Sequence, residues 1–106
     1  MPFLAYDRAL ELVADLEAPL AELRRCSCSE ADQLERASCS IVRNLAEGSG
    51  RSGADRRRFY AYAYGSLREC KAVLELAVAK RWLAERPAAY AVAHELGAML
   101  YRLAGR

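Results

Sequence analysis

Arginine supplies most of the positive charge of this sequence, and several arginines lie in or lead into one stretch. The set is Arg36, Arg43, Arg51, Arg56, Arg57 and Arg58. A planar guanidinium group donates two hydrogen bonds at once to a phosphate. Tyr60, Tyr62 and Tyr64 follow directly, and aromatic rings among cations can stack on bases. The stretch is therefore a candidate site for RNA or single-stranded nucleic acid, and the alternative is a solvated charged face of a helix.

A second set of polar residues recurs at helical spacing just before this stretch. Apolar residues at three- and four-residue steps mark one helix face for burial: Leu34, Ala37, Ile41 and Leu45. A polar stripe runs beside them: Gln33, Arg36, Ser40, Asn44 and Glu47. One interpretation is a solvated surface. The other is a hydrogen-bonded network against another helix or subunit, because Gln, Ser and Asn impose geometry where exposed positions usually carry Lys or Glu.

The residues that could hold a metal or perform catalysis do not form a recognisable set. Glu47, Glu69 and His94 lack the Glu-x-x-His pairs of di-iron bundles. The cysteines fit no zinc spacing: Cys26, Cys28, Cys39 and Cys70. No nucleophile with a nearby base and no phosphate loop is visible. We therefore expect reduced thiols, no metal, no cofactor, no catalytic residues and no enzymatic activity.

The elements that position these residues are predicted to be helices. The first runs from about residue 4 to 24, and Pro19 should kink or break it near residues 15–18, because proline removes a hydrogen bond and clashes with the preceding turn. A loop follows at 26–29, where Ser29 is a natural N-cap.

The next helix is expected over about residues 30–48. Gly48 and Gly50 can take the left-handed backbone angles that end a helix. Ser52 and Asp55 approximate a capping box that starts the following helix. The chain therefore turns between about residues 48 and 54.

The third helix should extend from about 54 to 84 and end before Pro87, which suits an early position in the last helix. Cys70 falls on its apolar face. The last helix has its own apolar seam: Val92, Leu96, Met99, Leu100 and Leu103. Helices joined by short loops favour antiparallel neighbours, so the sequence predicts an all-α, up-down four-helix bundle.

The chain is expected to be one domain, residues 1–106, since this length is typical of a single domain. No run of eighteen apolar residues is present and an acidic residue stands at position 7, so we expect neither a membrane span nor a signal peptide, and a cytoplasmic location. The net charge is only +2.

One segment resembles a known family. Its motif is Gln33-Leu34-x-Arg36-Ala37-x-x-Ser40-Ile41-x-x-Asn44-x-Ala46-Glu47-Gly48-x-Gly50-Arg51, then Arg58-Phe59-x-x-x-Ala63-x-Gly65-Ser66-Leu67-x-Glu69. It is similar to the bacterial four helix bundle proteins, which include proteins encoded in intervening sequences of large-subunit ribosomal RNA genes. A more distant relative is the accessory protein of diversity-generating retroelements. The likeness is dense over residues 33–69 and extends along nearly the whole chain.

The resemblance implies an up-down bundle that assembles as a barrel-like homopentamer and has no known catalysis. For the retroelement relative it implies binding to nucleic acid and to a reverse transcriptase; that relative is strongly basic, unlike this chain. We add Glu69, which ends the motif, to the candidate subunit or helix interface.

Two hypotheses about function follow. In the first, the protein is a non-catalytic oligomeric adaptor whose Arg-rich corner binds structured RNA or a nucleic-acid enzyme such as a reverse transcriptase. In the second, it is a purely structural or protein-interaction module, and the polar stripe holds subunits together. The two differ in whether nucleic acid binds at all.

Overall fold

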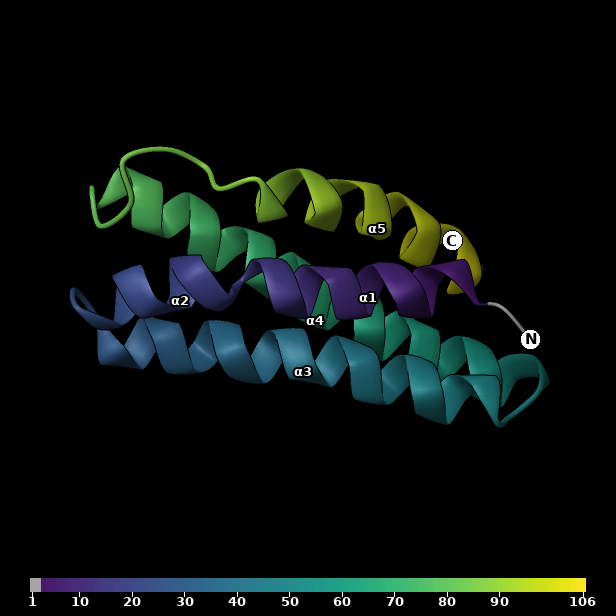
Figure 1. Cartoon of the computed structure of the whole chain (residues 1–106). Coiled ribbons are helices and arrows are strands. Elements are labelled where there is room, and N and C mark those ends of the chain that lie inside the picture. The colour runs from purple at the N-terminus through teal and green to yellow at the C-terminus, as the bar shows by residue number, and fades with distance from the viewer. Residues whose placement is uncertain (1–2) are drawn as a thin grey trace.

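The computed structural model describes residues 3–106, which form helices and connecting turns and no strand. The helices are α1 (Leu4–Asp15), α2 (Glu17–Arg24), α3 (Cys28–Ser49), α4 (Gly53–Ala79) and α5 (Ala89–Leu103). Figure 1 shows that α1 and α2 continue one another as a single broken rod, which packs with α3, α4 and α5 in antiparallel order. The molecule measures 42 × 21 × 20 Å. The predicted all-α four-helix bundle is therefore confirmed.

Pro19 explains the break in the first rod. Its ring has no N–H and would crowd the carbonyl of Asp15 in an unbroken helix. The helix accordingly breaks at Leu16, which is at once the C-cap of α1 and the N-cap of α2, although its N–H still bonds the carbonyl of Leu12 at 3.0 Å. The Leu16 carbonyl then accepts a bond from the N–H of Leu20 at 2.8 Å, which restarts the helix. The break falls where the sequence predicted it.

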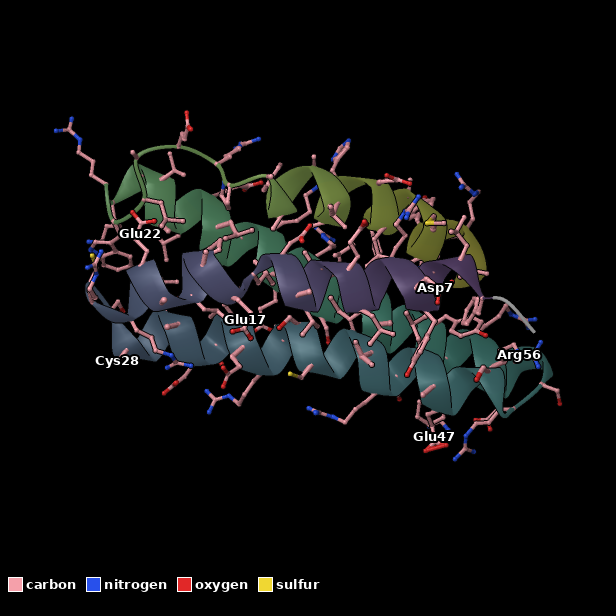
Figure 2. The ribbon with its side chains drawn as sticks, viewed as in Figure 1. Asp7, Glu17, Glu22, Cys28, Glu47 and Arg56 are labelled. Atoms are coloured by element: carbon pink, nitrogen blue, oxygen red, sulfur yellow. The ribbon has the colours of Figure 1, made fainter. Side chains whose placement is uncertain are left out.

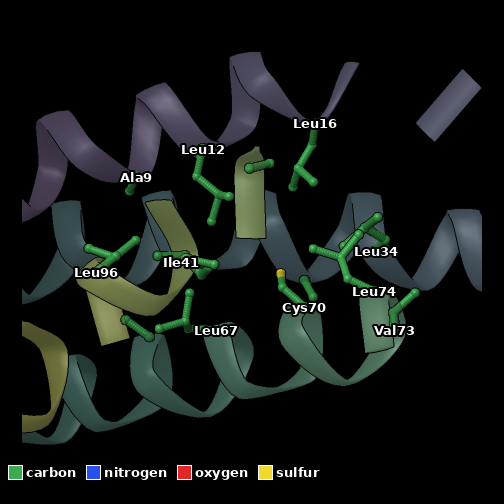
Figure 3. Packing of buried hydrophobic residues seen from close by; sticks show 14 of the residues in the cluster. Ala9, Leu12, Leu16, Leu34, Ile41, Leu67, Cys70, Val73, Leu74 and Leu96 are labelled. Carbon is green, nitrogen blue, oxygen red and sulfur yellow. The ribbon is translucent and has the colours of Figure 1, made fainter. Parts of the chain in front are cut away.

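The core is built mainly from leucines that all the helices contribute, and it runs the length of the bundle (Figure 3). Leu34, Ile41 and Leu45 of α3 are fully buried, as the three- and four-residue spacing predicted. Burying a side chain of this size stabilises the fold by about 1.5–3 kcal/mol. Cys70 lies in the same core, fully buried, which confirms its predicted place on the apolar face of α4.

The start of α3 differs from the prediction. Ser27, not Ser29, is the N-cap: its backbone is extended and its Oγ accepts a hydrogen bond from the N–H of Glu30 at 3.2 Å. Cys28 is consequently the first residue of the helix. Two serines in the run Cys-Ser-Cys-Ser offer the same capping hydroxyl, but Ser27 is the one with a glutamate three residues later, which is the spacing of a capping box.

The turn between α3 and α4 also uses different residues from those predicted. Gly48 lies inside the last turn of α3, and Gly50 has φ −87°, so neither is left-handed. The positive φ, 59°, belongs to Gly53. Ser52 is the N-cap of α4 but its side chain makes no capping hydrogen bond, so the predicted capping box with Asp55 is wrong.

The end of α4 lies at Ala79, five residues before the predicted end at 84. Arg81 has φ 63°, the N–H of Trp82 bonds the carbonyl of Ala77 at 2.9 Å, and the N–H of Arg81 bonds that of Val78 at 3.0 Å. These bonds form a Schellman motif, which usually has glycine at the left-handed position. Because an arginine takes this position, the sequence carries no glycine signal for the end of α4.

Candidate nucleic-acid interface

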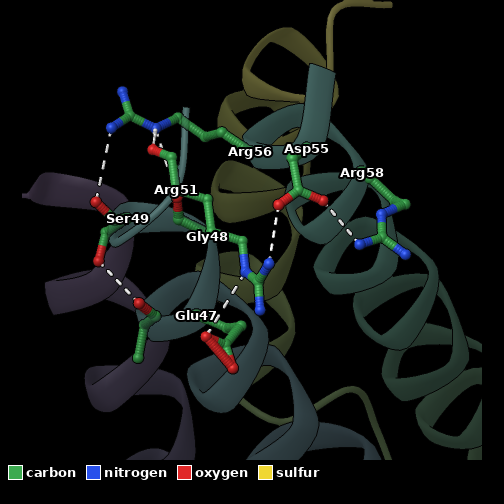
Figure 4. Close-up of polar contacts among 8 residues, drawn as sticks. Glu47, Gly48, Ser49, Arg51, Asp55, Arg56 and Arg58 are labelled. Carbon is green, nitrogen blue, oxygen red and sulfur yellow. Dashed lines mark hydrogen bonds and ion pairs between the residues drawn. The ribbon is translucent and has the colours of Figure 1, made fainter. Parts of the chain in front are cut away.

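Asp55, in the first turn of α4, lies between two arginine side chains at the α3–α4 corner (Figure 4). Its Oδ2 lies 2.8 Å from Nη1 of Arg51, and its Oδ1 lies 2.6 Å from Nη2 of Arg58. Arg51 Nε also lies 3.6 Å from a carboxylate oxygen of Glu47. The hydrogen bond from Arg51, followed by that from Arg58, lowers the pKa of the Asp55 carboxyl below its ordinary value.

Arg58 and Arg51 also cover an aromatic ring. Their guanidinium carbons lie 4.6 Å (Arg51) and 4.9 Å (Arg58) from the centroid of Phe59. Phe59 meets Tyr62 edge-on, with centroids 5.6 Å apart, and the Tyr62 side chain is 49% exposed. We call Arg51, Asp55, Arg58, Phe59 and Tyr62 the corner cluster. Cation–π contacts of this kind hold the guanidinium planes in place at the surface.

Arg56 differs from Arg51 and Arg58, because its guanidinium group donates hydrogen bonds to the backbone at the end of α3. Nε donates to the carbonyl of Arg51 at 2.7 Å and to that of Gly48 at 3.3 Å, and Nη2 reaches the carbonyl of Ser49 at 3.5 Å. The last carbonyls of a helix lack intrahelical partners and carry partial negative charge. Arg56 therefore caps α3 and ties it to α4.

The other candidate arginines are spread over the surface. Successive helix residues are rotated by about 100°, so Arg57 points away from its two neighbours, and its Cδ lies beside Gly105 at the C-terminal end. Arg36 donates to Oε1 of Gln33 at 2.9 Å, and Arg43 is exposed farther along α3. The structure thus brings Arg51 and Arg58 into one cluster and places Arg36, Arg43, Arg56 and Arg57 apart from it.

The predicted tyrosine run divides in the same way. Tyr62 is exposed in the corner cluster, whereas Tyr60 is buried, only 5% exposed, with its ring 5.8 Å from that of Phe3. Tyr64 faces α5, where its ring meets Tyr101 at 5.7 Å. Only Tyr62 of the three is therefore available to a ligand at the corner.

The polar stripe of α3 is part inward-facing and part exposed. Ser40 Oγ lies 2.9 Å from Oγ of Ser66 on α4, and the amide of Asn44 donates to the carbonyl and the hydroxyl of Ser40 at 2.9 and 3.0 Å. These groups form a network between α3 and α4 of one protomer. The remaining candidates are exposed: Gln33, Arg36, Glu47 and Glu69.

A groove that the sequence reasoning missed lies between α4 and α5. It has a volume of about 560 Å³, and its lining includes Tyr64, Arg68 and Lys71 from α4 and His94, Tyr101 and Arg102 from α5. The α4 residues Tyr64, Arg68, Lys71 and Glu75 recur at three- and four-residue steps. That period marks a single helix face and was the signal available in the sequence.

Within residues 3–106, no group of three or more His, Cys, Asp or Glu side chains is placed to hold a metal ion. The four cysteines are unpaired with one another, and burial raises the pKa of the Cys70 thiol to about 12. A thiol that stays protonated is a poor nucleophile. None of the helices described is long and apolar enough to cross a membrane.

The described residues form a small all-α protein, a helical bundle with an arginine-bearing corner, and nothing in them points to catalysis. The chain belongs to the 23S rRNA-intervening sequence protein family, whose family model matches residues 3–102. The resemblance inferred from the motif at residues 33–69 is thereby confirmed.

A solved structure shares the fold. It is a Bacteroides thetaiotaomicron protein of unknown function, described as belonging to the S23 ribosomal protein family. Its TM-score is 0.87 at 18% sequence identity, and the alignment covers 97% of this chain and 100% of that one. A comparison with curated proteins gives no match.

Proposed function

We propose that the protein is a non-catalytic, self-associating adaptor of the cytoplasm that binds structured RNA through its α3–α4 corner. The observation that carries the proposal is that two guanidinium groups, Arg51 and Arg58, lie on either side of one carboxylate and against the ring of Phe59. The family's description, a protein of an intervening sequence in 23S rRNA, supports RNA as the partner.

The corner keeps positive charge in spite of its ion pairs. Counted over this whole end of α3 and α4, four arginines, at 51 and 56–58, outnumber two acids, Glu47 and Asp55, which leaves a formal charge of +2 (four minus two). Asp55 holds the two guanidinium groups in fixed positions, and a preorganised donor loses less conformational entropy when a phosphate binds. Tyr62 beside them offers a ring for a base to stack on.

Self-association would place several copies of a weak RNA-binding site in one assembly. The homopentamer that the family resemblance implies would carry about +10 in total and repeat the corner around an axis. Repeated phosphate contacts gain affinity through effective concentration. A reverse transcriptase or another nucleic-acid-processing protein would then meet RNA already held on the bundle.

The test uses anisotropy of a labelled RNA hairpin at low and near-physiological salt, with the protein's mass measured by light scattering in the same buffer. The corner variant, Arg51→Gln with Arg57→Gln and Arg58→Gln, removes the two cluster arginines and the adjacent Arg57 at the same end of the bundle, and it leaves the cap Arg56 intact. The control variant removes three charges at the opposite end of the bundle, Arg25→Gln, Lys80→Gln and Arg81→Gln (Figure 1).

We expect the corner variant to bind at least about tenfold more weakly and to lower the salt slope by about 2–3, since each lost phosphate contact removes about 0.7–0.9. The control should stay near the wild type. A wild-type protein that binds no hairpin at low salt would overturn the proposal, as would equal losses in the two variants.

A second candidate is a structural or protein-interaction module. The observation in its favour is that Arg51, Arg56 and Arg58 already make hydrogen bonds within the chain. In that case the same experiment gives an oligomer that binds no RNA, and the exposed part of the polar stripe is the surface to test.

A further inference from the structure

We infer that the α4–α5 groove is a binding site for single-stranded RNA, distinct from the corner cluster. The inference rests on the proposed function in that RNA is the partner, and it adds a second surface with a preference for unpaired bases. Three features of the groove carry it: cations without carboxylate partners, aromatic rings beside them, and an elongated space between two closely packed helices.

The groove cations are not neutralised. In residues 3–106, Arg68, Lys71 and Arg102 make no ion pair. Glu75 is the acid in the lining, and its carboxylate accepts a hydrogen bond from the hydroxyl of Tyr90. Three cations minus one anion leave +2 in the lining, as much as the formal charge of the whole chain.

His94 adds a donor to this surface. The ammonium of Lys71 lies 3.1 Å from Nδ1 of His94. An ammonium group can only donate, so Nδ1 accepts from Lys71 in the tautomer that carries its hydrogen on Nε2. Phosphate oxygens entering the groove would therefore meet guanidinium, ammonium and imidazole donors from two helices.

Aromatic rings stand at both ends of this row of cations. At one end Tyr64 and Tyr101 meet edge-on, Tyr101 is 47% exposed, and the guanidinium of Arg68 lies 6.0 Å from the Tyr64 centroid. At the other end Lys71 lies over the ring of Tyr90 at 5.4 Å. Rings interleaved with cations are the usual platform for unpaired bases.

The shape favours an extended strand over a protein helix. Tyr64 and Glu75 are eleven residues apart on α4, so the groove is roughly 16 Å long. Three small residues, Ala72, Gly97 and Ala98, belong to the lining. A Cβ on Gly97 would lie 2.9 Å from Cδ2 of Leu67, so the two helices are already close there. Leu67 itself is fully buried. The lining offers cations beside its apolar groups and rings, which suits a strand that carries both phosphates and bases.

The test measures binding of a labelled octauridylate to the full-length protein. The groove variant is Arg68→Gln with Lys71→Gln and Arg102→Gln, and the matched control is the triple variant at positions 25, 80 and 81. Competitors are an abasic oligonucleotide of equal length and a poly-glutamate peptide of equal charge. Circular dichroism checks that each variant keeps its helices.

We expect the groove variant to bind octauridylate at least about tenfold more weakly and its salt slope to fall by about 2, since each lost contact to a single strand removes about 0.7. The control should change less than threefold, on the order expected for loss of general charge attraction. The abasic and poly-glutamate competitors should be about tenfold weaker, because neither has bases to stack.

Tyr101 gives a second, charge-neutral test that does not depend on the triple variant. Tyr101→Ala should weaken octauridylate binding about tenfold through lost stacking, and Tyr101→Phe should restore it. Equal binding by Tyr101→Ala and the wild type would overturn the inference. Poly-glutamate that competes as well as octauridylate would also overturn it, and would indicate an acidic protein partner instead.

The two sites fail in different ways. If the groove variant keeps wild-type affinity for octauridylate while the corner variant loses the hairpin, the groove inference is wrong and the proposed function stands. If octauridylate binding depends on the groove while the hairpin does not bind, the corner proposal is wrong. A wild-type protein that binds neither probe overturns both.

Discussion

The ionisation of Asp55 reports on the corner more directly than any other single residue. Arg51 and Arg58 both donate to its carboxylate, and these bonds lower its pKa. In the unfolded chain the group returns to its ordinary value of 3.8. Because the folded pKa is the lower one, the ion pairs stabilise the fold fully above about pH 4 and lose that effect as the pH falls through the folded pKa.

Asp55→Asn should therefore lower Tm at pH 7, and the difference from the wild type should shrink as the pH falls below 3.8. Asparagine is close in size but carries no charge to hold two guanidinium groups. The measurement is thermal unfolding by circular dichroism from pH 2 to 7. The control is Glu85→Gln, which should leave Tm at pH 7 unchanged. Glu85 is exposed, and its carboxylate makes no ion pair in residues 3–106. A constant Tm gap at every pH would contradict the assignment.

At the scale of elements, the α3–α4 corner depends on a close approach at Gly48. A Cβ there would lie 2.7 Å from Cε1 of Tyr60 and 3.2 Å from Cβ of Phe59. Tyr60 is buried and packed against Phe3, so its ring has little room to move. Glycine is thus needed at this position for space, because its backbone is ordinary α-helix.

Gly48→Ala should destabilise the protein by about 1–3 kcal/mol, the cost of overpacking, despite the better helix propensity of alanine. Gly65→Ala is the matched control in α4. A Cβ on Gly65 meets nothing within 4 Å, so alanine should stabilise the protein by about 0.5–1 kcal/mol. Urea unfolding of the two variants measures both effects. Two changes of the same sign would show that the contact at Gly48 does not limit the corner.

Local rules predicted the elements where one residue type decides the outcome. The leucine spacing of α3 fixed its buried face, and Pro19 fixed the break in the first rod. These local rules failed where more than one residue type or position could fill the same role. Ser27 and Ser29 are both residues that cap helices, and Arg81 takes the left-handed position that glycine usually fills. Tertiary packing of Trp82 and Leu83 against the bundle decides that last stop.

The candidate site was harder to predict because adjacency in sequence is not adjacency in space. Arg56, Arg57 and Arg58 are consecutive, yet one caps α3, one lies by the C-terminal end, and one joins the corner cluster. The groove shows the converse. Its cations Arg68 and Arg102 lie on helices far apart in the chain, so only the packing of α4 against α5 brings them together.

For the whole molecule, a net charge of +2 conceals an uneven distribution. The α3–α4 corner and the α4–α5 groove each have a formal charge of +2, so the remaining residues sum to −2 (nine basic and eleven acidic). Association with a polyanion depends on local potential more than on the total. The small net charge is therefore compatible with RNA binding on two surfaces.

The face of α4 next to the groove, on the α3 side, has the other sign. A shallow pocket there is lined by Glu30 and Gln33 of α3 and by Glu69 and Leu76 of α4, and Leu76 is 40% exposed. Figure 2 shows charged side chains at both ends of the bundle, with Glu22 at one end and Glu47 and Arg56 at the other. We propose this acidic surface around an exposed leucine, which includes Gln33 of the polar stripe, as the contact with another protomer.

Glu69→Arg should then dissociate the proposed homo-oligomer, because it reverses a charge at this face without touching the core. Light scattering over a concentration series should show the mass falling toward that of the 11.8 kDa chain, with Tm of the bundle unchanged. Glu85→Arg, at an exposed position in the connection before α5, makes the same change in charge and should leave the mass as it is. If Glu69→Arg keeps the wild-type mass, the subunits contact one another through a different surface. If the wild type is itself monomeric at every concentration, the proposal of self-association is wrong. The RNA sites must then act singly, with the salt dependence of one chain.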